Sequence, residues 1–97
     1  MQESDCRWQA VGSVAEYSHA VLDDEVLLYH RLSRDTWLID LTAFSLITHL
    51  WQQASSLADC LSALNQHRGE ERLESQQLIA YLEHLQKSGL VSRYVAD

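Results

Sequence analysis

The fold is decided by residues 36–50, TWLIDLTAFSLITHL, where the hydrophobic pattern changes its period. The first part of this stretch, Thr36–Leu41, is rich in β-branched and aromatic residues, which favour a strand. After it, apolar residues recur at the spacing of one helix face: Ala43, Leu46, Ile47 and Leu50. Asp40 or Thr42 can cap that helix. The sequence therefore predicts strands up to about residue 41 and helices beyond it.

Two more strands are expected before this stretch. Tyr17–Leu22 and Val26–Leu32 are rich in Val, Leu, Tyr and Ala, and the polar run Asp23–Glu25 between them has the length of a hairpin turn. A second polar break, Ser33–Asp35, comes before the strand that follows. Together these segments predict a three-stranded antiparallel meander. Arg7–Val11 is a weaker candidate for a further short strand.

Two further helices are expected after the first. Ser56 opens one of them, with Asp59 three residues later in an approximate capping box. The apolar face of this helix consists of Leu57, Cys60, Leu61 and Leu64. The polar stretch Asn65–Glu71 contains a glycine and is typical of a loop. The third helix is expected over Ser75–Ser88, and its apolar face consists of Leu78, Tyr81, Leu82 and Leu85.

The end of the chain predicts a helix stop followed by a short strand. Gly89 ends the third helix, because glycine adopts the left-handed capping conformation without strain, and Leu90 can then contact Leu85. Leu90–Val95 alternates weakly, as a short strand would. The predicted fold class is α+β: a winged helix-turn-helix with an N-terminal three-stranded antiparallel sheet, three helices and a short terminal strand. Residues 1–14 are expected to form an N-terminal segment, and residues 15–97 the domain.

Composition narrows the classes of partner. The 97 residues suit one domain, and their formal charge is −7. Such a balance disfavours nucleic acid and anionic membranes and favours a cationic partner, although it is also an ordinary way to keep a small protein soluble. No signal peptide or membrane-spanning run is visible, so we expect a cytoplasmic protein in which Cys6 and Cys60 are free thiols.

The pattern of reactive side chains predicts no metal, no cofactor and no catalytic activity. The five histidines are His19, His30, His49, His67 and His84. No two of them lie three to five residues apart, whereas a zinc site usually includes one such local pair. The carboxylates of Asp23–Glu25 cluster in a turn, where solvent leaves their acidity ordinary. Neither a nucleophile motif nor a glycine-rich phosphate loop is present.

A helix-turn-helix raises the question of DNA binding. The helix in the recognition position, Ser75–Ser88, contains one lysine and no arginine, and Glu74 precedes it. Gln76 and Gln77 have the groups that read adenine, but the cationic side chains that supply most of the affinity are missing. No nucleic-acid partner is therefore expected, and a DNA-binding regulator is the alternative interpretation.

The last strand of the meander is a candidate binding site. Residues 36–39 expose apolar side chains on both faces, and a terminal strand of a sheet has unpaired backbone groups. An extended peptide could pair with them while a neighbouring helix supplies side-chain pockets. Equally, Trp37 and Ile39 could be core residues below a covered edge, or a second copy of the chain could form a homodimer through the same edge.

The order of several segments resembles that of the PqqD-like family. They are residues 23–30 (DDEVLLYH), 35–40 (DTWLID) and 82–91 (LEHLQKSGLV). The likeness spans about residues 17–91 and is greatest to the small members named for a system encoded with a relative of HPr kinase. Two segments depart from the family pattern. Residues 52–55 (QQAS) replace an Asp-Gly turn, and residues 74–77 (ESQQ) lack an Asp-Val helix start.

The resemblance implies a non-enzymatic, chaperone-like domain that presents a leader or partner peptide to a modifying or kinase-related enzyme. Similar domains recognise ribosomally made, modified peptides as an added strand between the third strand and the third helix. A dimerising structural subunit of a kinase-related complex is a further alternative. Carried onto this sequence, the peptide-binding residues are Thr36, Trp37, Leu38, Ile39, Gln77, Leu78, Tyr81 and Leu85. We expect Leu38 or Ile39 to supply one wall of the groove and Leu78, Tyr81 or Leu85 the other, with one member of each set partly exposed.

Overall fold

The computed structural model describes residues 5–66, 68–69 and 71–96. Its strands are β1 Asp5–Ala10, β2 Tyr17–Leu22, β3 Glu25–His30, β4 Thr36–Asp40, β5 Ser55–Ser56 and β6 Val91–Ala96. Its helices are α1 Leu41–Gln52, α2 Leu57–Asn65 and α3 Ser75–Lys87, with a short 3-10 turn at Val14–Glu16. The expected α+β fold is confirmed in its antiparallel sheet, its three helices and its terminal strand. The finer winged-helix assignment stays a prediction.

The expected meander is confirmed as a sheet with the order β2-β3-β4. Asp23 makes the first turn with a φ of 56°, a left-handed conformation that Asp tolerates better than most residues. The middle strand ends at His30 and not at Leu32, because the chain turns there. The His30 carbonyl accepts from Arg34 N–H at 2.8 Å, and His30 N–H donates to the Asp35 carbonyl at 2.9 Å. Leu32 therefore lies in the turn, 76% exposed.

The helix starts agree with the capping signals in the sequence. Asp40 Oδ1 accepts a hydrogen bond from the Ala43 N–H at 2.8 Å, so α1 begins at residue 41, which was expected to end the strand. Ser56 caps α2 by accepting from Asp59 N–H at 3.2 Å. The α1 residues predicted to face the core are all buried: Ala43, Leu46, Ile47 and Leu50.

The stop after α3 follows the predicted geometry. Gly89 has a φ of 85°, Gly89 N–H donates to the Gln86 carbonyl, and Leu90 N–H donates to the Leu85 carbonyl. This pair of bonds is a Schellman motif, which closes the helix and directs the chain back over its last turn. Leu85 and Leu90 are both buried, as the hydrophobic contact of that motif requires.

A second sheet, which the sequence pattern did not reveal, joins three distant segments in the order β5-β1-β6. The expected short strand near Arg7–Val11 is present as β1, and it pairs antiparallel with both neighbours. Trp8 lies opposite Ser55 on one side and Arg93 on the other, and its side chain is buried in the core. Residues 5–10, which were expected to belong to a segment ahead of the domain, thus contribute to the same core.

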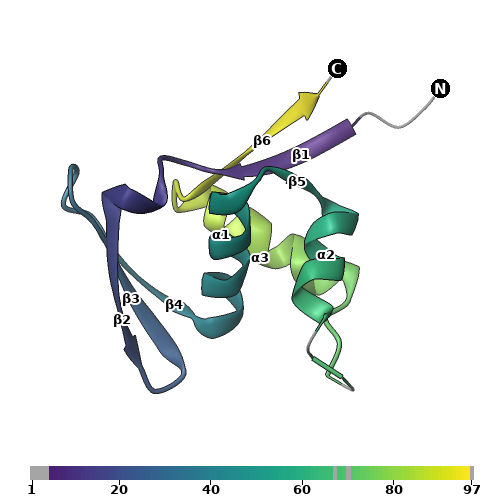
Figure 1. Ribbon diagram of the computed structural model, residues 1–97, viewed down its shortest axis with the longest axis horizontal. Coiled ribbons are helices and arrows are strands. Elements are labelled where there is room, and N and C mark those ends of the chain that lie inside the picture. The colour runs from purple at the N-terminus through teal and green to yellow at the C-terminus, as the bar shows by residue number, and fades with distance from the viewer. Residues whose placement is uncertain (1–4, 67, 70, 97) are drawn as a thin grey trace.

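The core lies between the helices and one face of each sheet. In Figure 1 the meander stands on one side of the three helices, while β1 and β6 run together across their top. The fully buried side chains come from both parts, including Val26 and Leu28 of β3 and Leu46, Leu78 and Leu82 of the helices. Among the described residues, no helix is long and apolar enough to cross a membrane.

Candidate functional site: the β4 edge and α3

Strand β4 forms one edge of the meander. Within the part of the chain that the structure describes, its only strand partner is β3. The register alternates its side chains: Trp37 and Ile39 lie opposite the buried Leu28 and Val26, so they face the core. Leu38 points to the opposite face and is 55% exposed. The backbone groups on the free side of β4 are therefore beside both a buried and an exposed apolar surface.

A hollow of about 240 Å³ opens between β4 and α3. Its lining combines Leu38, Ile39 and Asp40 from the strand, Ala43 from α1, and Tyr81 and His84 from α3. A second hollow of about 480 Å³ shares Tyr81 and His84 and continues along α3 toward Arg68 and Leu73. The two hollows adjoin at these two α3 side chains. We call the two together the α3 groove.

Two side-chain hydrogen bonds bridge β4 and α3. At one end of the strand, Trp37 Nε1–H donates to the Ser88 carbonyl at 3.1 Å. At the other end, the Tyr81 hydroxyl donates to Asp40 Oδ2 at 2.8 Å. Burial and the neighbouring Asp40 raise the pKa of Tyr81 above its ordinary value, so its hydroxyl remains a donor at neutral pH. These bonds fix the distance between strand and helix, and the Tyr81–Asp40 bond crosses the groove at the surface.

The structure divides the predicted binding residues into two groups. Thr36, Leu38 and Gln77 are exposed, and Trp37 and Tyr81 are half-buried. Ile39, by contrast, is buried, and Leu78 and Leu85 are fully buried. Those two leucines support α3 from the core side, where a docked peptide does not reach in this conformation. Leu38 and Tyr81 are thus the partly exposed members of the strand set and the helix set.

Several groove residues were missing from the sequence prediction, among them Asp40, Ala43 and His84. Asp40 was recognised only as a possible helix cap, yet its second carboxylate oxygen accepts from Tyr81. His84 lies three residues after Tyr81, so both side chains emerge on neighbouring parts of one helix surface. That spacing was a usable signal, because residues three apart on a helix share a face.

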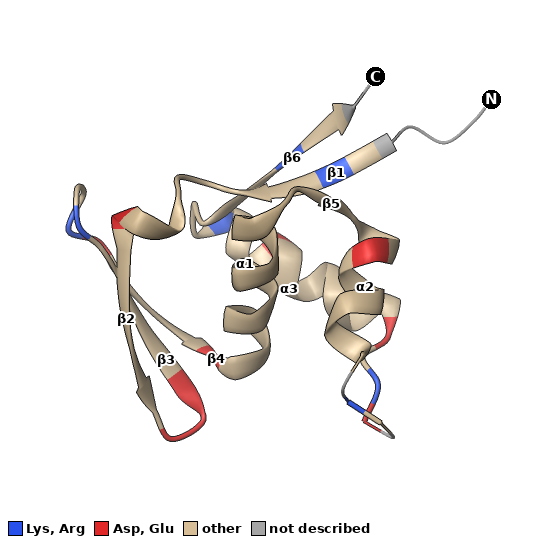
Figure 2. Cartoon of the chain, in the orientation of Figure 1, with Lys and Arg blue, Asp and Glu red and all other residues tan. Residues whose placement is uncertain are grey.

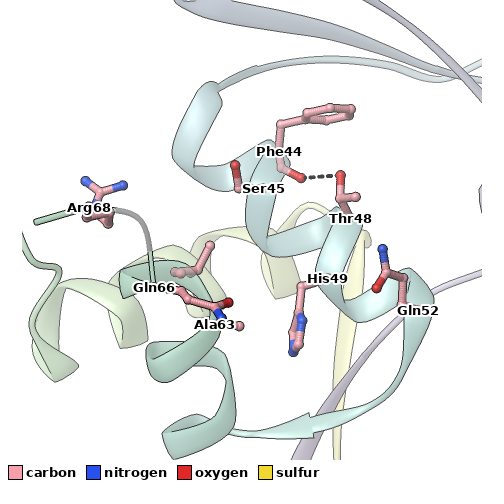
Figure 3. Close-up of a pocket in the computed structure, with 9 residues that line it drawn as sticks. Phe44, Ser45, Thr48, His49, Gln52, Ala63, Gln66 and Arg68 are labelled. Atoms are coloured by element: carbon pink, nitrogen blue, oxygen red, sulfur yellow. Dashed lines mark hydrogen bonds between the residues drawn. The ribbon is translucent and has the colours of Figure 1, made fainter.

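Another hollow, of about 600 Å³, lies between α1 and the end of α2. Figure 3 shows its lining, including Phe44, Thr48, His49 and Gln52 of α1 and Arg68 beyond α2. The Thr48 hydroxyl donates to the Phe44 carbonyl, and His49 Nε2 lies 2.9 Å from Ser55 Oγ. The polar groups are largely engaged with their own helix or its neighbour. They do not converge on a common point as they would around a small ligand.

A cluster of Glu16, His30 and Ser33 lies at the end of β3. His30 Nε2 lies 2.8 Å from Glu16 Oε1, and His30 Nδ1 lies 2.9 Å from Ser33 Oγ. This order of Ser, His and Glu resembles a nucleophile relay, but the Ser33 oxygen also accepts from Asp35 N–H in an exposed turn. The hollows described above all lie elsewhere. The cluster therefore stabilises the turn after β3 and offers no bound substrate a place.

The sequence predicts that the five histidines, which lie on several elements, do not form a metal site. Among the described residues, no group of three or more His, Cys, Asp or Glu side chains is placed to hold a metal ion. His67 lies outside the residues that the structure describes. Lys and Arg residues are scattered along the chain in Figure 2 and do not collect on α3.

With this geometry in place, the chain was compared with known proteins. No family model matches it, and no curated protein and no solved structure is similar enough to count as a match.

Proposed function

We propose that this domain binds an extended peptide as an additional strand on β4, with side chains of the peptide in the α3 groove. One observation carries the proposal: the free edge of β4 lies beside a groove whose walls, Leu38 and Tyr81, are accessible while their supporting residues are buried. Strand addition uses backbone hydrogen bonds for affinity and alternating pockets for selectivity. The free edge of β4 supplies the backbone hydrogen bonds, and the α3 groove supplies the pockets.

The charge of the site favours a peptide in which a basic residue lies two positions from an apolar one, because Leu38 and Asp40 lie two apart on β4 and so share one face of the sheet. Glu25 and Asp40 line the groove, and neither has a Lys or Arg ion pair among the described residues. The formal charge of −7 adds a long-range attraction for a cationic chain. Apolar residues of the peptide would then cover Leu38 and Tyr81 on the same side.

A peptide that follows the whole of β4 must pass the Tyr81–Asp40 bond. Because this bond is exposed, it exchanges for bonds to water at a small net cost. The Trp37–Ser88 bond remains closed, since Trp37 also packs beneath the sheet against Tyr17. We infer that the peptide enters from the Asp40 end of the strand.

The wider role rests on the resemblance to PqqD-like proteins. In that role, the domain is a cytoplasmic peptide chaperone, and it holds a leader or partner peptide for a modifying or kinase-related enzyme. The domain itself contributes no catalytic group and no cofactor. Its α3 surface lacks the cluster of cations that a DNA-binding helix needs, which supports a peptide over a nucleic acid.

The test selects binders from a library of random peptides about twelve residues long, displayed on phage. We expect enriched sequences in which Lys or Arg lies two positions from an apolar residue. Leu38→Asp should abolish their binding, because the new carboxylate would lose its water in the complex without a partner. Leu32→Asp is the matched control, since Leu32 is 76% exposed and lies outside the groove. Tyr81→Phe, which removes only the crossing bond, should bind at least as well as the wild type.

Hydrogen exchange tests the backbone part of the proposal. In the free protein, the β4 amides that point away from β3 should exchange faster than those of residues 26–30, and the selected peptide should slow them. Two results would contradict strand addition. One is full protection of β4 in the isolated monomer, and the other is equal peptide binding by the Leu38→Asp and Leu32→Asp variants.

A further inference from the structure

The outward face of the meander carries an apolar row across its centre. Ala20, Leu27 and Leu38 lie opposite one another on β2, β3 and β4, so their side chains form one line. Leu27 is 38% exposed and Leu38 is 55% exposed. On either side of the row, Leu22 and Tyr29 are also exposed. Helix α1 packs on the opposite face, against Val26, Leu28 and Ile39, and Figure 1 shows no described element over the outward one.

The two ends of the same sheet differ in charge. The turn between β2 and β3 holds Asp23 and Asp24, Glu25 begins β3, and Asp40 ends the neighbouring strand. The turn between β3 and β4, at the other end, holds Arg31 and Arg34. Figure 2 shows these acidic and basic turns at opposite ends of the hairpins. Asp35 and Glu16 lie at the same end as the two arginines, so this end is balanced in formal charge, whereas the other end carries four carboxylates.

We propose that two copies of this chain associate by stacking the outward faces of their β2-β3-β4 sheets. Two symmetric arrangements can bring the same face of two sheets together. A two-fold axis along the strands would place the acidic turn on the acidic turn. A two-fold axis across the strands places the acidic turn of each copy over Arg31 and Arg34 of the other. Charge complementarity selects the second arrangement.

The apolar row fits this axis. The row crosses the middle of all three strands, so the two-fold axis can run along it. The row of one copy then lies against the same row of the other copy. Leu27, on the central strand, then lies against the partner's Leu27. On one side of the axis, Tyr29 faces the partner's Glu25, so a hydroxyl donor meets a carboxylate acceptor. The backbone edge of β4 lies outside this interface, whereas the Leu38 side chain belongs to both the dimer face and the peptide site.

Few side chains take part, so the dimer should be weak. A standard interface uses roughly 20–30 residues a side, and this face offers three short rows. Association should therefore be visible only at high concentration and should weaken as salt screens the end-to-end charges. The first measurement is sedimentation velocity of the untagged full chain from about 10 μM to 1 mM, at low and high salt.

Variants separate this dimer from other assemblies. Leu27→Glu places two like charges on the axis and should raise the dissociation constant by at least about tenfold. Leu32→Glu is its control, off the sheet face. Arg31→Glu/Arg34→Glu should have a similar effect, whereas Arg72→Glu/Lys87→Glu changes the formal charge equally at exposed sites away from the sheet and should not. Circular dichroism checks that each variant is folded.

A charge-reversal rescue completes the test. Asp24→Lys/Glu25→Lys leaves Asp23, with its left-handed backbone, unchanged. Alone, this variant should not dimerise, and mixed with Arg31→Glu/Arg34→Glu it should form a heterodimer because each acidic turn again meets a basic one. A monomer at every concentration would overturn the proposal. So would a dimer that survives Leu27→Glu and shows protected β4 amides, since that dimer would pair through the strand edge. Neither result bears on peptide binding by the monomer.

Discussion

The two sheets of this protein are built in opposite ways. The meander uses one continuous stretch, residues 17–40, and leaves an edge and a face open to the surroundings. The β5-β1-β6 sheet joins residues 5–10, 55–56 and 91–96, and its Trp8 is buried in the core. The difference separates two tasks. The sheet of distant segments holds the chain together, while the local sheet presents surface for partners.

Removal of the Trp8 side chain should have the largest effect on stability. Trp8 is 5% exposed and connects β1 to the core. Trp8→Ala should lower the free energy of unfolding by about 3–5 kcal/mol, because it leaves a large cavity. Leu38→Ala, on the open face of the meander, should change it by only about 0.5 kcal/mol. Urea denaturation followed by circular dichroism compares them, and equal losses would show that the meander is as integral to the core as β1.

The same contrast explains which parts of the fold could be predicted from the sequence. The meander and the helices carry local signals: polar breaks at residues 23–25, helical periodicity from Ala43, a cap at Asp40 and a stop at Gly89. All of these were recognised, with strand and helix ends in error by one or two residues. The β5-β1-β6 sheet has no local signal of comparable strength. Strand β5 has two residues, both serine, and its pairing depends on tertiary contacts.

A buried polar contact in the helical half of the molecule sharpens the comparison. Asn65, expected to begin a loop, is the last residue of α2 and is buried. Its Nδ2–H donates to the Leu73 carbonyl at 2.9 Å, and its Oδ1 accepts from Leu73 N–H at 2.6 Å. Asn65→Ala leaves both backbone groups without a partner, so it should cost about 1–3 kcal/mol.

The exposed neighbour Gln66 provides the control for that experiment. Gln66→Ala removes a side chain of similar length from the same helix end and should stay within about 0.5 kcal/mol of the wild type. If both substitutions cost the same in urea denaturation, the two Asn65 hydrogen bonds contribute nothing beyond helix propensity.

The candidate site was only partly predictable for a related reason. The exposed strand residues and Tyr81 follow from alternation and from the resemblance to PqqD-like proteins. The burial of Leu78 and Leu85 depends on how α3 is rotated against the other helices. Periodicity identifies the apolar face of the helix, but it does not show which residues of that face are fully buried. Asp40 has a second role that only the structure reveals, because Tyr81 is distant in sequence and meets it through the fold.

The smallest expected effect concerns the polar contact at the end of the meander. The hydrogen bond from His30 holds the pKa of Glu16 below its ordinary value of 4.5. A carboxylate whose pKa is lower in the folded state stabilises the protein above pH 4.5. That contribution is lost as the pH falls through the folded pKa. The Glu16 side chain is partly exposed, so solvent screening keeps the contribution small.

The measurement compares the wild type with Glu16→Gln by urea denaturation between about pH 7 and pH 3. The wild type should be slightly more stable at pH 7, and the difference should shrink below pH 4.5, since glutamine does not titrate. In a His30→Ala background the pH dependence of that difference should largely disappear, because the main cause of the lowered pKa is gone. A difference that stays constant down to pH 3 would mean that Glu16 acts through the shape of the turn and not through its charge.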